Sequence, residues 1–431
     1  MTDRACEAAF PTLCDTVRRD GDAWVSEVGG LTLHSHFQPI YSLSHGRPVG
    51  HEALLRAVDA QRMPLAPAHA LRGDGTLADV LLRDRAARLV HMLNFAEQAG
   101  PAHWLFCNMH PQVFLQGPRL DADGFQAALM AHSGLAPHRL VVEVLEDAVS
   151  DEDDFDAAVA LARQRGCLLA LDDFGAGHSN FDRVWRIQPD IVKLDRSLVA
   201  RAAHDRRARR VVTQMTSLLH QCGALVLMEG VETQDEAFVA LEADADFVQG
   251  FLFAKPQARM VSGQHTPPAL VNLWDAFEAR WMDEHQAQRE HIAPYTNAIG
   301  YASALLSAGR SMQEALASFL ALPGAEVAYL LGADARQIGV NHWAASRPLR
   351  EQPAFEPMRN THGARWARRP YYRRAIEALG RVQVTRPYRT LHGAHLCVTV
   401  SVAFRVGDEL NVICGDVGWT DHARPPGKLP R

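Results

Sequence analysis

Short apolar runs alternate with longer amphipathic segments between residues 33 and about 255. In the longer segments, such as Leu77–Gln98, apolar residues recur every three or four positions, which is the period of a helix. This alternation favours a sheet of largely parallel strands joined by helices. The apolar runs predict eight strands, at Leu33–Ile40, Val49–Leu55, Trp104–Met109, Leu140–Leu145, Leu168–Asp172, Ile191–Leu194, Leu225–Glu229 and Phe247–Phe253.

The first two predicted strands are joined differently from the others. Only the turn-like segment SLSHGRP separates them, which predicts a hairpin, so one strand runs against its neighbours. Eight strands with intervening helices over about 220 residues predict an α/β fold, a (β/α)8 TIM-like barrel with one antiparallel strand. Further helices are expected at Phe155–Arg165, Ser197–Cys222 and Asp235–Glu242.

The texture of the chain changes at Val261–Pro268, which contains a glycine and two prolines. A helical region interrupted at Pro294 is expected from Ala269 to about Phe319, followed by a C-terminal α+β domain. We therefore expect an N-terminal extension (1–30), a barrel domain (31–258), a helical linker (259–290) and a C-terminal domain (291–431). The C-terminal domain is expected to contain strands Val327–Leu331, Gln337–Asn341, Gln383–Thr385, Leu396–Phe404 and Leu410–Asp416, and a helix at Tyr371–Leu379.

Composition restricts the possible functions. The 431 residues are 47% hydrophobic, which excludes a disordered chain, and the net charge of −6 (44 basic against 50 acidic) argues against binding of polymeric nucleic acid. The basic run at 201–210 is interpreted as a solvated helix face in preference to a binding patch. Seven cysteines without a CxxC spacing favour a reducing cytoplasm, and neither a signal peptide nor a membrane segment is recognised.

Acidic and amide side chains end most of the predicted barrel strands. In such barrels the chemistry lies at the C-terminal ends of the strands. One acidic residue there is usually a helix N-cap, but several converging carboxylates repel one another and require cations. Oxygen ligands suit Mg²⁺ or Mn²⁺, and adjacent aspartates can serve two ions. The acidic and amide residues concerned are Glu52, Asn108, Glu143, Glu146, Asp172, Asp173, Glu229, Glu232 and Gln249, and Lys193 lies on a predicted strand among them.

Seven segments, in this order, resemble the EAL-domain phosphodiesterases, bacterial enzymes that hydrolyse cyclic di-GMP to 5′-pGpG. They are HEALLR at 51–56, FCNMHP, VVEVLE, LALDDFGAGHSN, PDIVKLDRSLV, MEGVET and VQGFLFAKP, within Leu33–Pro256. The resemblance implies two bound Mg²⁺ or Mn²⁺ ions and cyclic di-GMP as the substrate. A cyclic di-GMP receptor or protein-interaction module without hydrolysis, and another barrel phosphohydrolase, remain the alternatives.

The resemblance also implies roles for individual residues. Lys193 would contact the attacking water, and Glu146 would hold the loop that carries Asp173. Substrate contacts would come from Gln38 and Arg56, with Glu232 and Gln249 near the metals and substrate. The implied metal ligands are Glu52, Asn108, Glu143 and Asp172 for one ion, and Asp172, Asp173 and Glu229 for the other.

Three features depart from the family pattern. His51 stands where an aromatic residue usually precedes E-A-L, and His178 lies in an unusual GHSNF segment. The segment 57–76, after Arg56, replaces the usual apolar and acidic connection to the first helix. Because that segment would lie near the guanine sites, substrate affinity is the property it affects.

The C-terminal region is similar to PAS-like and Cache sensor domains, in which an antiparallel sheet surrounds a small ligand. Arg369, Tyr372, Tyr388 and Asp416 match positions that often line such a pocket, although packing alone also explains them. Before this region, Leu270, Leu273, Trp274, Phe277 and Trp281 form one apolar stripe of a connecting helix. The stripe either packs on the chain itself or forms a homodimer that couples a sensor to the barrel.

Overall fold

The computed structural model describes residues 10–72, 75–116, 124–145, 152–177, 181–261, 263–345, 360–389 and 396–419, and the structural statements below concern these residues. The chain divides into two compact units, one up to Glu278 and one from Ala279 onward. Each unit is described by itself. Among the described residues, no helix combines the length and the apolar character that a membrane span requires.

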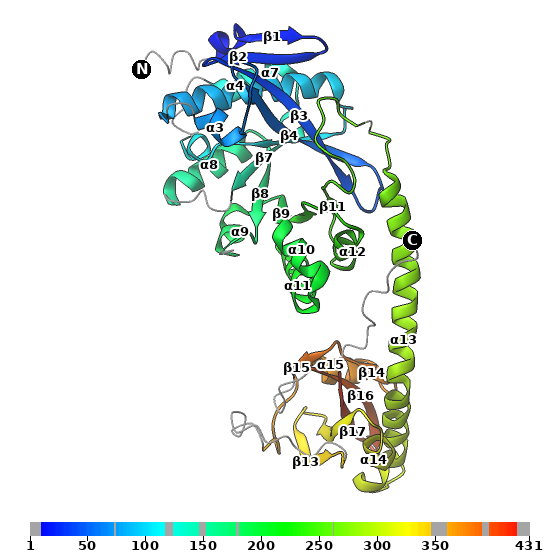
Figure 1. Cartoon of the computed structure of the whole chain (residues 1–431). Coiled ribbons are helices and arrows are strands. Elements are labelled where there is room, and N and C mark those ends of the chain that lie inside the picture. The colour runs from blue at the N-terminus through cyan, green and yellow to red at the C-terminus, as the bar shows by residue number, and fades with distance from the viewer. Residues whose placement is uncertain are drawn as a thin grey trace. The chain divides into compact units, whose positions relative to one another are not determined.

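The first unit contains a closed barrel of eight strands (Figure 1), as the sequence predicted. Neighbouring strands are parallel except at the first strand, which pairs antiparallel with both β4 and β11. The expected hairpin therefore closes the barrel. The strands are β3 (Leu31–Ser42), β4 (Pro48–Val58), β6 (Trp104–Asn108), β7 (Leu140–Leu145), β8 (Leu168–Phe174), β9 (Ile191–Leu194), β10 (Leu225–Met228) and β11 (Phe247–Val248).

A layer of apolar side chains fills the barrel interior. Because side chains alternate along a strand, the residue two positions further along points into the same interior, one layer nearer the strand's end. In the parallel strands that next position carries a polar residue, such as Glu143 after Val141 or Lys193 after Ile191. The apolar layer thus forms the floor of a polar mouth. Its members are Ile40, Phe106, Val141, Ala170, Ile191, Leu227 and Phe247.

The N-terminal residues extend the sheet, which the sequence analysis did not anticipate. Strands β1 (Val17–Asp20) and β2 (Ala23–Val28) form an antiparallel hairpin, and β2 continues the sheet next to β3. Asn94 fixes this hairpin by accepting from the backbone N–H of Trp24 and donating to its carbonyl. Both strands are short, and in neither do apolar and polar residues alternate, so they lack a strong period-two signal.

Helices surround the barrel, and one predicted helix is divided. The expected helix Ser197–Cys222 breaks at Asp205, whose carboxylate caps the second segment by accepting from Arg207 N. Arg209 of the basic run donates hydrogen bonds to the carbonyls of Ala202 and Ala203. At least this arginine of the run therefore contributes to the fold. The helices are α2 (Phe10–Cys14), α3 (Pro67–Arg72), α4 (Leu77–Gln98), α5 (Pro111–Leu115), α7 (Phe125–Ser133), α8 (Glu152–Gln164), α9 (Phe181–Ile187), α10 (Arg196–His204), α11 (Arg206–Gln221) and α12 (Gln234–Glu242).

The expected interruption at Pro294 is wrong. Helix α13 (Pro268–Ser307) runs through this proline as 40 continuous residues. Glu290 and Pro294 are both exposed, so the carbonyl that loses its N–H partner can bond water instead. The interruption lies after Ser307 instead, and α14 (Met312–Leu320) then begins at a Ser311–Glu314 capping box.

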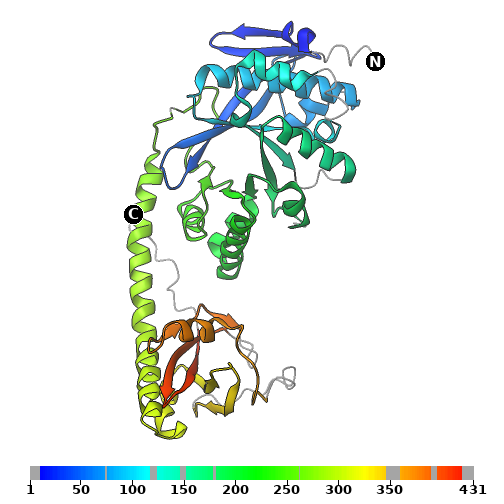
Figure 2. The ribbon, with the colours of Figure 1, turned by 180° about the vertical axis from the view of Figure 1, so that it is seen from behind.

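The second unit contains an antiparallel sheet with helices on both faces, as expected for an α+β domain (Figure 2). Helices α13 and α14 cover one face, where Phe319 packs against Gly415; a Cβ there would lie 2.3 Å from the Phe319 ring. Helix α15 (Pro370–Glu377) covers the other face. The order is β13 (Gln337–Trp343), β12 (Ala325–Gly332), β17 (Glu409–Gly418), β16 (Leu396–Val406) and β14 (Gln383–Val384), with β15 (Tyr388–Arg389) also pairing with β16.

Candidate functional site

Polar side chains from all eight barrel strands lie in one layer at the C-terminal end of the barrel. Each stands one interior layer beyond the apolar floor, so the spacing of two along the strands creates the ring. On antiparallel β3 the same layer is reached two residues before Ile40, at Gln38, which is directly opposite Glu52 in the register. The ring consists of Gln38, Glu52, Asn108, Glu143, Asp172, Lys193, Glu229 and Gln249.

Lys193 is the centre of this ring. Its side chain is 1% exposed, and its ammonium lies 2.7 Å from Glu229 Oε1, 2.9 Å from Asp172 Oδ1 and 4.0 Å from Glu52 Oε1. It also forms an ion pair with Glu143. One buried cation therefore faces four carboxylates, a concentration of negative charge that is costly without further cations.

The ionisation of the ring reflects this crowding. Burial raises the pKa of Glu143 well above its ordinary value, opposed by Lys193. Burial likewise raises the pKa of Glu229 to about 8, again opposed by Lys193 and reinforced by Asp172. For Lys193, burial lowers the pKa, but the surrounding carboxylates outweigh it and raise the pKa well above the usual range. The lysine is thus held as a permanent cation.

The donor set fits divalent cations. Asp172, Asp173 and Glu229 each offer an oxygen, and these oxygens all lie within 4.8 Å of one another. The Glu143 carboxylate is fully buried and pairs with Lys193, a cation that it shares with three other carboxylates. Oxygen-only sets with uncompensated carboxylates suit Mg²⁺, Mn²⁺ or Ca²⁺.

Two amides orient the Glu52 carboxylate. Asn108 Nδ2 donates to Oε1 at 2.9 Å and Gln249 Nε2 donates to Oε2 at 2.8 Å. These two bonds use the amide nitrogens and not the amide oxygens. Gln249 Oε1 is buried and accepts no hydrogen bond from the described residues. Asn108 and Glu52 thus form a hydrogen-bonded pair, and the sequence analysis predicts both as ligands of one metal.

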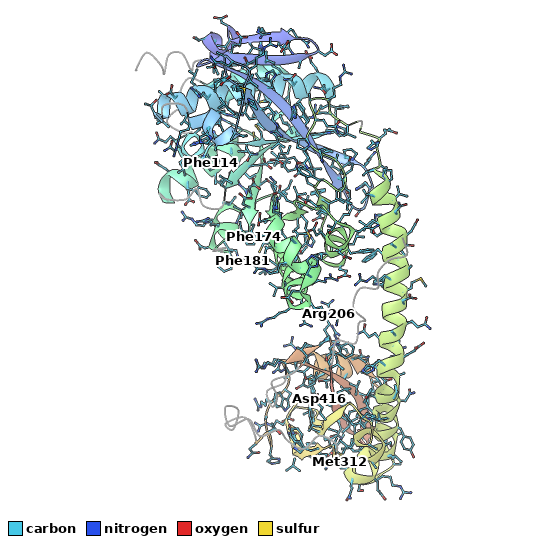
Figure 3. All side chains as sticks on the ribbon, in the orientation of Figure 1. Phe114, Phe174, Phe181, Arg206, Met312 and Asp416 are labelled. Carbon is cyan, nitrogen blue, oxygen red and sulfur yellow. The ribbon has the colours of Figure 1, made fainter. Side chains whose placement is uncertain are left out.

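Asp173 occupies a strained backbone position. Its φ of 55° lies in the left-handed region, and its N–H donates to Asp172 Oδ1 at 2.9 Å. The following Phe174 packs edge-to-face on Phe181 of α9, 5.4 Å between ring centroids (Figure 3). The turn directs two successive carboxylates toward the barrel mouth. Glu146 and His178 lie outside the described residues.

Three predicted substrate positions lie differently around the ring. Gln38 Nε2 donates to the carbonyl of Ala254 at 3.2 Å, which fixes its amide at the rim. Arg56 is half-buried and lies four residues along β4 from Glu52, roughly 13 Å at strand spacing. Glu232 lies outside the hydrogen-bonded ring, because its side chain is exposed and its backbone N–H donates to Glu236.

A buried charged pair behind Asn108 was not singled out from the sequence. Asp84 and Arg88 of α4 form an ion pair, and the second Asp84 oxygen accepts from the backbone N–H of His110. A signal was present in the sequence, because Asp84 and Arg88 are four residues apart on a predicted helix, the spacing of an ion pair along one helix face. A buried charge needs a partner, so a charged residue on the inner face of a helix indicates a specific polar contact.

In the second unit, three of the four expected pocket residues converge. Tyr388 Oη lies 2.6 Å from Thr399 Oγ1, which donates to Asp416 Oδ1 at 2.7 Å, and the Arg369 guanidinium lies 5.8 Å from the Tyr388 ring. Asp416 lies within the sheet (Figure 3), and burial raises its pKa to about 7. Tyr372 does not join this group, and its hydroxyl donates a hydrogen bond to the carbonyl of Ala333.

Comparison with known proteins gives consistent matches. The family model described as EAL domain matches residues 27–256. An uncharacterized protein of Azorhizobium caulinodans is 31% identical over 54% of this chain and 32% of its own length. The cyclic di-GMP phosphodiesterase RocR of Pseudomonas aeruginosa is 28% identical over 58% of this chain and 62% of its own length. The chain thus spans less than two thirds of the length of these relatives.

One solved structure matches most of the fold. The Bacillus subtilis YkuI protein, with an EAL domain, in complex with cyclic di-GMP and calcium, superposes with a TM-score of 0.74 at 19% identity. The match covers 90% of this chain and 96% of that chain, so it extends beyond the barrel into the second unit. At this identity the likeness concerns the fold.

Proposed function

The chain belongs to the EAL domain family through residues 27–256, and from this premise we propose that it hydrolyses cyclic di-GMP to 5′-pGpG in a reaction that needs divalent cations. The observation that carries the proposal is the ring of oxygen donors around Lys193. Every predicted metal ligand in the ring is present as a carboxylate or amide. A barrel that only bound nucleotide would not need so much uncompensated charge.

Mg²⁺ or Mn²⁺ ions held by Glu52, Asn108, Glu143, Asp172, Asp173 and Glu229 would neutralise the phosphodiester and lower the pKa of water. Lys193 would hold the attacking water by an N–H donor, because its permanent charge prevents it from competing for a cation. Arg56 would bind a phosphate of the substrate through two parallel N–H···O hydrogen bonds. Water adds to phosphorus, the P–O3′ bond breaks, and the water proton ends on the released 3′-hydroxyl.

The proposal is tested with the full chain, cyclic di-GMP and Mn²⁺ or Mg²⁺, beside Glu52→Ala. Formation of 5′-pGpG by the unaltered chain, and its loss in Glu52→Ala, is the expected result. Binding of cyclic di-GMP without any linear product, even at high protein concentration, would instead assign the chain to the receptors. The altered segment 57–76, part of which forms β5 (Pro64–Leu65) against β4, bears on affinity in either case.

We further propose that the second unit is a PAS- or Cache-like sensor that binds a small ligand and regulates the barrel, and that the chain acts as a cytoplasmic homodimer. The convergence of Arg369, Tyr388 and Asp416 on one face of an antiparallel sheet supports a ligand site. Deletion of the residues after 290 should change turnover or dimerisation in solution. Unchanged values of both would contradict regulation through this unit.

A further inference from the structure

A buried ion pair lies on helix α4, on the side that faces the loop after β6. Asp84 is 3% exposed and Arg88 is 6% exposed, and Arg88 Nε lies 2.8 Å from Asp84 Oδ2. Arg88 Nη1 also donates to Gln126 Oε1 of α7 at 2.7 Å. Replacing a buried ion pair with apolar residues is often neutral or stabilising, so stability alone explains such a pair poorly.

The second oxygen of Asp84 reaches beyond the helix. Asp84 Oδ1 accepts a hydrogen bond of 3.0 Å from the backbone N–H of His110. The same residue begins α5, because His110 Nδ1 accepts from Gln112 N at 3.3 Å. The backbone at His110 is therefore fixed on both sides, by a buried carboxylate and by the helix that it caps.

His110 lies only two residues after Asn108, whose amide donates to Glu52 Oε1 at 2.9 Å. A displacement of the His110 backbone is carried along the chain to Asn108, since few torsions separate them. We propose that Asp84 is a positioning residue: it holds the His110 backbone so that Asn108 and Glu52 keep the alignment of two oxygen donors for one divalent cation. This inference rests on the proposed metal-dependent function.

The test measures Mn²⁺ binding by calorimetry without nucleotide, so that its readout does not depend on turnover. Asp84→Ala should bind Mn²⁺ about tenfold more weakly, the lower end of what loss of a residue behind a metal ligand costs. Asp84→Asn keeps one side-chain oxygen, which can accept from only one of the two donors, so its affinity for Mn²⁺ should fall about threefold. Circular dichroism verifies folding, and Asp84→Asn carries the test where Asp84→Ala does not fold.

Asn94→Ala is the matched control, because Asn94 is a buried polar residue of the same helix that holds β2 at Trp24 instead of the β6 loop. It should lose stability while keeping Mn²⁺ affinity within about twofold. Saturating Mn²⁺ should restore most of the turnover of Asp84→Ala. Wild-type Mn²⁺ affinity in the Asp84 variants, or an equal loss in Asn94→Ala, would overturn the positioning role.

The two proposals fail in different ways. If the unaltered chain binds Mn²⁺ but forms no 5′-pGpG, the phosphodiesterase proposal fails while the affinity comparison between Asp84 and Asn94 variants still stands. If the unaltered chain hydrolyses cyclic di-GMP and Asp84→Ala reaches the same rate at a Mn²⁺ concentration that does not saturate the unaltered chain, only the positioning role fails.

Discussion

The ammonium of Lys193 lies 2.7 Å from Oε1 of Glu229, at the end of two neighbouring barrel strands. Both side chains come from a layer that also contains three other carboxylates in contact range of the same lysine. The lysine therefore does two things at once. It offsets part of the charge that the ring concentrates, and it places an N–H donor among the predicted metal ligands.

Replacement of Lys193 by methionine keeps the length of the side chain and removes its charge. We expect turnover of cyclic di-GMP to fall by a factor of about 100 or more, in the range lost with other groups that handle a reacting proton. Stability without divalent cations should fall by about 3–5 kcal/mol, because buried carboxylates lose their counter-charge. Steady-state kinetics and chemical denaturation measure the two effects.

The control for this change is Arg186→Met, which removes a cation from the exposed Arg186–Asp156 ion pair of the same unit. Exposed pairs contribute little, so this variant should change stability by less than about 1 kcal/mol. Mn²⁺ should raise the melting temperature of Lys193→Met more than that of Arg186→Met. Full turnover by Lys193→Met would refute the role of the lysine in orienting water.

Asp173 gives a prediction in which stability and activity separate. A φ of 55° costs more conformational free energy for an aspartate than for a glycine. Burial, and to a smaller extent repulsion by Asp172, raise the pKa of Asp173. Asp173→Gly should therefore be as stable as the unaltered chain, or more stable by up to about 1 kcal/mol. It should nevertheless lose turnover, since one predicted metal ligand is gone. A clear loss of stability would assign the carboxylate a structural role.

The barrel and its polar ring were predictable because both arise from one local rule. Period-two alternation places Glu143 two residues after Val141 and Lys193 two after Ile191, so a strand prediction also predicts which residues share a layer. The hairpin between the first two strands followed from its turn residues. These signals are contained within short segments of the chain.

The features that escaped prediction depend on partners distant in sequence. Strands β1 and β2 are held by β3 and by Asn94, some 70 residues away, and Pro294 is tolerated in α13 because its turn faces water. Asp84 gains its partner His110 only when α4 packs beside the barrel. Local propensity gives no information about such contacts.

His51 predicts how stability depends on pH. The imidazole of His51 is fully buried next to His103, and neither of its nitrogens forms a hydrogen bond with the described residues. Burial lowers the pKa of His51 to about 4. The unfolded chain takes up this proton near pH 6.5, so stability is full above that pH and falls as pH drops toward 4, by up to about 1.4 kcal/mol per pH unit.

His91 adds to the same loss, since burial lowers its pKa to about 3. His51→Phe should therefore flatten, but not abolish, the decline in denaturation free energy between pH 6.5 and 4. Phenylalanine also suits a buried site without hydrogen-bond partners, so this variant should be at least as stable at pH 7. An unchanged slope would show that His51 does not stay neutral in the folded chain.

Gly250 tests whether the loops after β10 and β11 form one unit. A Cβ at Gly250 would lie 2.0 Å from the carbonyl oxygen of Val231, a backbone atom that cannot rotate away. Val231 N also donates to Gln249 O at 3.0 Å, so separating the loops would displace Gln249 and the nearby Glu229. Gly250→Ala should cost about 3 kcal/mol of unfolding free energy and weaken Mn²⁺ binding. Gly177→Ala, at the same barrel end with open space around its Cβ, should change neither by more than about 0.5 kcal/mol.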